Sequence, residues 1–162
     1  LYGSHDLVVM DGGSRFELVG ACCDGAAGVA GGAPARLVAV TGTDPIALAA
    51  TYALVKATAQ RPGIGSTELL VNRADGETAA RTFALADEAA RQFLGRPLVL
   101  AGSLPDDACL DLALRAGMTL LDAAAGSPAA AAAHELATRL LAPAGGPGSR
   151  GRMPAAPYRV MR

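Results

Sequence analysis

Apolar runs alternate with amphipathic stretches along the chain, and this alternation predicts strands separated by helices. Short apolar runs rich in β-branched residues are typical of strands buried on both faces. Longer stretches with apolar residues three and four apart indicate helices that bury one face. The predicted strands are residues 5–10, 36–41, 67–71 and 97–101, with a short extended piece at 118–121. The predicted helices are residues 14–23, 45–60, 77–94, 106–116 and 128–141.

The order of these elements predicts the fold class. Buried strands that alternate with helices imply right-handed crossovers, so we expect a doubly wound α/β fold with a mostly parallel sheet and helices on both faces. Capping residues support the helix starts, because Asp44 precedes Pro45 at the start of one predicted helix. Residues 1–142 are expected to form one domain, and the Gly-, Pro- and Arg-rich residues 143–162 are expected to be a disordered tail.

Composition narrows the classes of partner. The chain has 162 residues, a net charge of −1 and only 4% aromatic residues, so neither a basic nucleic-acid surface nor an aromatic stacking platform is expected. The three cysteines have no metal-ligand spacing and are interpreted as small buried thiols. No apolar run reaches the length of a membrane span, and no signal peptide is visible.

Polar residues follow each predicted strand, where open α/β sheets bind their ligands. These positions are Asp11, residues 41–44, Asn72, Arg73, Pro105, Asp106 and Asp107. Each taken alone is more simply explained as a helix cap or a turn. Together they predict a ligand site at the carboxyl edge of the sheet.

Five segments, in order, carry a resemblance to a known family. They are "DLVVMDGGS", "VTGTDPIALAATYALVK", "LLVNRAD", "FALADEAARQFLG" and "LAGSLPDDACLDLALRAG". Over residues 2–141 the chain resembles the second half of the MinD/ParA group of deviant P-loop ATPases, and within that group the FlhG/FleN branch of flagellar-number regulators. The segment over residues 40–56 is the most specific match.

The resemblance implies roles for the strand-end residues. Asp11 would be the Walker B-like aspartate that holds Mg²⁺ through a water molecule. Asn72 and Arg73 would contact the adenine base of ATP or ADP, and Pro105 with Asp106 and Asp107 would shape the other side of the base pocket. The intact protein would be an ATP-dependent homodimer acting as a cytoplasmic positional regulator, for example of flagellar number. Peripheral contact with the inner membrane face is a further expectation.

The phosphate-binding part of that family is missing from these residues. A Walker A loop ends in Gly-Lys-(Ser/Thr), and the single lysine, Lys56, lies within a predicted helix. One interpretation, which the start at Leu1 favours, is that residues upstream carry this loop. The alternative is a degenerate pseudo-ATPase that acts as a protein-interaction scaffold. In either case this chain alone is not expected to hydrolyse ATP, because positioning and charge stabilisation of the phosphates are the catalysis.

Overall fold

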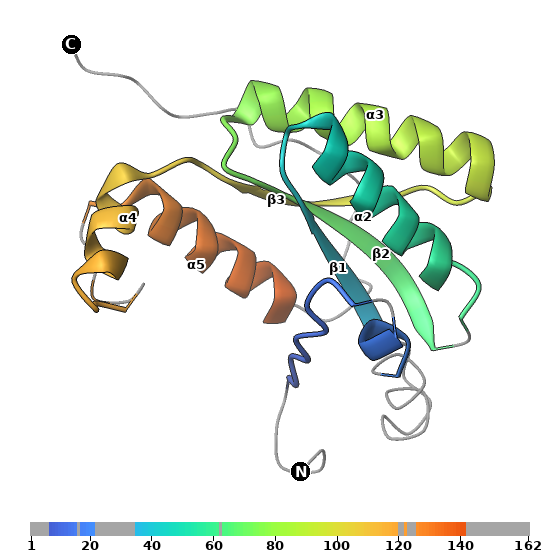
Figure 1. The fold of residues 1–162 in the computed structure, drawn as a ribbon, viewed down its shortest axis with the longest axis horizontal. Helices are drawn as coiled ribbons and strands as arrows, with labels where there is room; N and C mark the ends of the chain where they lie inside the picture. The colour runs from blue at the N-terminus through green and yellow to red at the C-terminus, as the bar shows by residue number, and fades with distance from the viewer. Residues whose placement is uncertain are drawn as a thin grey trace.

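The computed structural model describes residues 7–15, 17–21, 35–61, 63–119, 122 and 126–141. The strands β1 (Ala35–Thr41), β2 (Ile64–Asn72) and β3 (Val99–Leu104) form a parallel sheet in the order β1-β2-β3. The helices are α2 (Pro45–Thr58), α3 (Gly76–Leu94), α4 (Ala108–Arg115) and α5 (Pro128–Leu141). Figure 1 shows α2 and α3 on one side of the sheet and α5 on the other. The predicted class, α/β with a parallel sheet between helices, is confirmed.

Local signals account for the helix boundaries. The Asp44 carboxylate accepts a hydrogen bond of 2.9 Å from the Ala47 backbone nitrogen and so caps α2. Asp75 caps α3 in the same way through Thr78, at 2.7 Å. Gly95 ends α3 in the left-handed conformation, with φ of 66°, which glycine adopts without steric cost.

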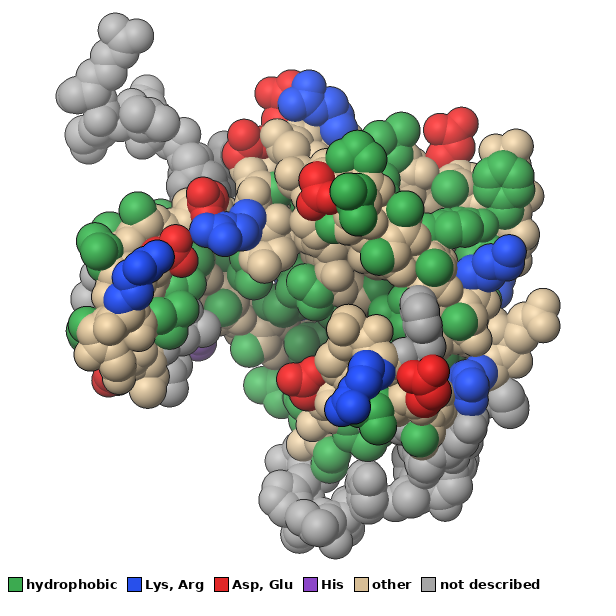
Figure 2. Space-filling model, in the orientation of Figure 1, with side chains coloured by type: hydrophobic (Ala, Val, Ile, Leu, Met, Phe, Trp, Pro, Cys, Tyr) green, Lys and Arg blue, Asp and Glu red, His purple; other side chains and the backbone are tan. Residues whose placement is uncertain are grey.

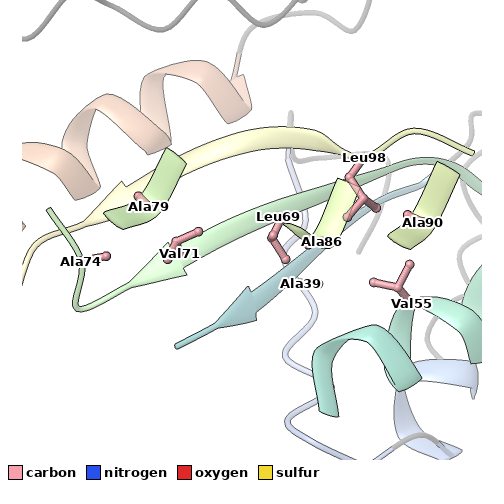
Figure 3. Packing of buried hydrophobic residues seen from close by; sticks show 9 residues of the cluster. All are labelled: Ala39, Val55, Leu69, Val71, Ala74, Ala79, Ala86, Ala90 and Leu98. Carbon is pink, nitrogen blue, oxygen red and sulfur yellow. The ribbon is translucent and has the colours of Figure 1, made fainter. Parts of the chain in front are cut away.

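The main core lies between the sheet and the helices α2 and α3. Leu69 and Val71 of the central strand point to this face and are 1% and 0% exposed. Alanines of α3, among them Ala86 and Ala90, lie opposite them, as Figure 3 shows. Because alanine has so short a side chain, α3 can approach the sheet closely, and the core is built with few aromatic residues.

A partly buried ion pair lies on the face that α5 covers. The Arg36 guanidinium of β1 binds both carboxylate oxygens of Glu68 in β2, at 2.7 and 3.0 Å. It also donates a hydrogen bond of 3.1 Å to the carbonyl of Leu140 near the end of α5. Arg36 therefore joins two strands and the carboxyl end of a helix that lies far away in the sequence.

The prediction of a strand at residues 5–10 is wrong for the part that the structure describes. Residues 7–10 form no strand, and the side chains from Leu7 to Met10 are 41% to 79% exposed. An apolar run becomes a strand only when a neighbour satisfies its backbone hydrogen bonds, and within the described sheet β1 pairs with β2 alone. Apolar composition indicated burial but could not supply that neighbour.

The other predicted boundaries differ by smaller amounts. Of the predicted helix at 14–23, residues 17–21 are described as helical, and Val19 packs against Ile64 at the start of β2. The strand predicted at 97–101 lies at Val99–Leu104, and residues 118 and 119 of the predicted extended piece are not in a strand. The proposed tail at 143–162 lies outside the described residues. Among the described helices, none combines the length and the apolar character that crossing a membrane requires.

Candidate functional site at the carboxyl edge of the sheet

The ends of β2 and β3 bring two of the predicted segments together. Asn72, the last residue of β2, is paired in register with Leu104, the last residue of β3. The backbone nitrogen of Ala74 continues the contact, donating a hydrogen bond of 3.0 Å to the Leu104 carbonyl. The turn after Asn72 and the turn that begins at Pro105 therefore lie side by side.

Arg73 occupies an unusual backbone conformation at this edge. Its φ is 57°, the left-handed region that residues other than glycine seldom adopt. Its backbone nitrogen donates to the Asn72 side-chain oxygen at 3.1 Å, which fixes the turn locally. Strained positions of this kind persist only where the surroundings over-determine them, and they cluster at functional sites.

Two carboxylates hold the Arg73 side chain. Its Nε donates to Asp106 at 2.8 Å, and its terminal nitrogen donates to Asp111 of α4 at 3.3 Å. The hydrogen bond with Asp106 is the main cause that raises the pKa of Arg73. Acidic and basic groups lie next to one another over α4 and the end of β3 in Figure 2. Exposed ion pairs contribute little to the stability of a fold. The main effect of the two ion pairs of Arg73 is therefore to orient the turn after β2 against α4.

Asp107 caps two helices at once. One carboxylate oxygen accepts from the backbone nitrogens of Cys109 and Leu110 in α4, at 2.9 and 3.2 Å. The other accepts from the Ser127 hydroxyl at 2.6 Å and the Ala129 backbone nitrogen at 3.2 Å, at the start of α5. The hydrogen bond from Ser127 is the largest cause that lowers the pKa of Asp107 below its ordinary 3.8. The structure thus gives Asp107 a capping role that the resemblance did not imply.

We expect Asp107→Asn to lower the melting temperature at pH 7, because the amide cannot accept from Ser127 and Ala129 as the carboxylate does. The sign of the pH dependence follows from the lowered pKa. As the pH falls through 3.8, the unfolded state binds the proton first, so the carboxylate's contribution is complete above that pH and is lost below it. Wild type should therefore lose melting temperature between pH 5 and pH 3 as Asp107 is protonated, and Asp107→Asn should lose less over the same range.

Thermal unfolding followed by circular dichroism at pH 7, pH 5 and pH 3 measures the change in melting temperature and its pH dependence. Asp106→Asn is the matched control, because Asp106 is exposed and caps no helix. A loss of melting temperature in Asp106→Asn as large as that in Asp107→Asn would contradict the double-cap assignment.

Asp11 lies away from this edge, and the expectation that it shares the site is wrong. Its carboxylate accepts a hydrogen bond of 2.8 Å from the Gly13 backbone nitrogen, which is a local turn. Gly12 next to it lies against Val19, which packs with Ile64, the first residue of β2. Since β2 runs nine residues from Ile64 to Asn72, this end of the strand is roughly 26 Å from Asn72. Figure 1 shows the segment near the start of β1.

The described residues do not by themselves form a cluster of metal ligands. Within the described ranges, no three or more His, Cys, Asp and Glu side chains come close enough together to hold a metal. Asp11 was expected at the carboxyl edge because residues 5–10 were expected to form a strand, and residues 7–10 do not join the sheet.

Two groups of charged residues were not predicted. Asp111 completes the network around Arg73. Its position in the first turn of α4, just after the predicted site residues, could have indicated that it belongs to the site. No sequence pattern indicates that Arg36 and Glu68 pair, because 32 residues separate them.

A separate cavity of about 220 Å³ lies toward the starts of β2 and β3, among residues that include Val55, Leu94 and Leu98.

The fold and this site define an α/β protein whose polar turns gather at the carboxyl edge of a parallel sheet. Neither a comparison with protein-family models nor one with curated proteins gives a match for the chain.

Proposed function

We propose that this chain is the base-binding part of a MinD/ParA-like adenine-nucleotide-binding domain. In the intact protein, ATP would switch a positional regulator between monomer and homodimer. The process that this regulator controls would be flagellar number or placement. A cytoplasmic location with peripheral contact to the inner membrane face belongs to the same proposal. The phosphate-binding loop has to come from residues outside these 162, so the chain alone does not hydrolyse ATP.

One observation carries the proposal. The two segments that resemble the family's base pocket, "LLVNRAD" and "LAGSLPDD", lie side by side, and the Arg73 side chain bridges them through Asp106. The left-handed backbone at Arg73 adds support, because such strain is concentrated at ligand sites. Asn72 is exposed at this edge and so is accessible to a ligand.

The adenine assignment predicts a change in base discrimination. In the natural protein that contains this chain, Asn72→Ala should reduce the preference for ATP over GTP by about tenfold, the value of one lost hydrogen bond of about 1.4 kcal/mol. Isothermal titration calorimetry with each nucleotide measures the ratio. Gln92→Ala is the matched control, because Gln92 is an exposed amide on α3, away from the edge. An unchanged ratio in Asn72→Ala would contradict the assignment, and no ATP binding by the natural protein would contradict the function.

A second candidate is a pseudo-ATPase that serves as a protein-interaction scaffold. The separation of Asp11 from Asn72 favours it, because a metal-dependent nucleotide site needs its carboxylate near the phosphates. The same calorimetry separates the two functions, since the scaffold predicts no ATP binding by the natural protein.

A further inference from the structure

The cavity at the starts of β2 and β3 lies at the end of the sheet opposite to Asn72. It measures about 220 Å³ and lies between the carboxyl ends of α2 and α3 and the first residues of the two strands. Thr67 comes two residues before Leu69 in β2 and so faces the same side of the sheet, toward the main core. Gly65, the extra residue of a β-bulge in β2, has no side chain. The space that Leu69 fills farther along the strand is therefore left open here.

The walls of the cavity are mostly apolar. Val55 of α2, Leu94 of α3 and Leu98 all line it. Figure 3 shows Val55, Ala90 and Leu98 together at one end of the core. A dry cavity of about 150 Å³ with apolar walls is large enough for benzene, so this cavity has room for one ring with a small substituent. Pockets for larger ligands begin at about 300 Å³, which indicates a ligand smaller than a nucleotide.

Arg96 brings a positive charge to the wall of the cavity. One N–H of its guanidinium donates to the carbonyl of Ala59, at the end of α2. A guanidinium has five N–H donors, and no carboxylate among the described residues forms an ion pair with Arg96. Asp87 of α3 binds Arg91 and the Leu98 backbone nitrogen instead. Arg96 therefore has both donors and charge available for an anion.

The Thr67 hydroxyl is the second polar group at the cavity. It makes no hydrogen bond within the described part of the chain, and a hydroxyl can donate to a carboxylate. The neighbouring Ser66 hydroxyl donates to Glu68 at 3.5 Å, and Glu68 is paired with Arg36. Apolar walls beside a cation and a hydroxyl suit a ligand that has an apolar body and one negative charge.

We infer that this cavity binds the anion of a small monocarboxylic acid with an aromatic or branched apolar body. The body lies against Val55, Leu94 and Leu98, and the carboxylate accepts hydrogen bonds from Arg96 and Thr67. Hydrogen bonds between a guanidinium and a carboxylate are stronger than those between neutral groups, so the negative charge is a requirement for tight binding. This site goes beyond the proposed base-binding edge, because it lies at the opposite end of the same strands.

Titration of the 162-residue chain with benzoate at pH 7, followed through the backbone amide signals by NMR, tests the inference. Benzoate should move the signals of Thr67 and Leu98 and leave that of Asn72 in place. Benzyl alcohol has the ring without the charge, and acetate has the charge without the ring. Each should bind about tenfold or more weakly than benzoate.

Variants of the two polar residues test their roles. Arg96→Gln should weaken benzoate binding by about tenfold and leave benzyl alcohol binding unchanged, because glutamine keeps a donor but carries no charge. Thr67→Val removes the hydroxyl and should weaken benzoate binding by about threefold. Arg81→Gln is the matched control, because Arg81 is exposed in the first half of α3 and does not line the cavity.

The absence of benzoate-induced shifts at Thr67 and Leu98 would overturn the inference. Equal affinities for benzoate and acetate would also overturn it, since they would indicate a surface arginine without a cavity. Equal affinities for benzoate and benzyl alcohol would indicate an apolar cavity that does not recognise an anion. A loss of benzoate affinity in Arg81→Gln as large as that in Arg96→Gln would contradict the role of Arg96.

Discussion

Leu69→Ala should lower the free energy of unfolding by about 3 to 5 kcal/mol. Leu69 lies on the central strand and is 1% exposed, between the sheet and the alanines of α3. Its removal forfeits the transfer energy of the buried side chain and leaves a cavity. The side chains of the surrounding alanines are too short to fill that cavity. Urea unfolding at pH 7 measures the loss.

Leu112→Ala is the matched control for this experiment. Leu112 lies on α4 and is 67% exposed, so its truncation should change stability by no more than about 0.5 kcal/mol. Losses of similar size in the two variants would contradict the location of the core between the sheet and α3.

Arg36→Met should cost about 3 kcal/mol, the second largest effect that we expect. The side chain of Glu68 is 9% exposed, and Arg36 supplies both of its ion-pair hydrogen bonds. Methionine keeps much of the arginine's bulk but leaves the carboxylate buried without its cation. The variant also loses the hydrogen bond to the Leu140 carbonyl, so the carboxyl end of α5 should exchange its amide hydrogens faster.

The double variant Arg36→Met/Glu68→Leu identifies the cause of that loss. If the cost comes from an unpaired buried charge, removing the charge as well should recover stability, and the double variant should be more stable than Arg36→Met. A double variant that is less stable than Arg36→Met would show that the ion pair itself, rather than the orphaned carboxylate, carries the stability.

Signals within one element predicted most of the fold. Asp44 and Pro45 mark the start of α2, and the Ala-rich helix predicted at residues 128–141 matches α5 residue for residue. Strands that alternate with helices along the chain imply parallel neighbouring strands, so Asn72 and Pro105 were expected at one edge of the sheet. The parallel register of β2 and β3 places both residues at that edge. This part of the site follows from topology alone.

Interactions between distant residues could not be predicted. Ser127 binds Asp107 across 20 positions, and nothing near either residue indicates that one carboxylate caps two helices. The same holds for Arg36 and Glu68, whose pairing depends on the strand register. The apolar run at residues 7–10 shows the limit most clearly, because its composition is that of a buried strand while the structure leaves it exposed and unpaired.

Chemical-shift mapping on the 162-residue chain tests the central claim most directly. Adding adenosine should move the backbone amide signals of Asn72, Arg73 and Asp106, at the carboxyl edge. The signals of Gly13, beside Asp11, and of Leu98, at the cavity near the strand starts, should stay in place. Shifts confined to Gly13 and Leu98, or no shifts at any of these residues, would contradict a base-binding site at the ends of β2 and β3.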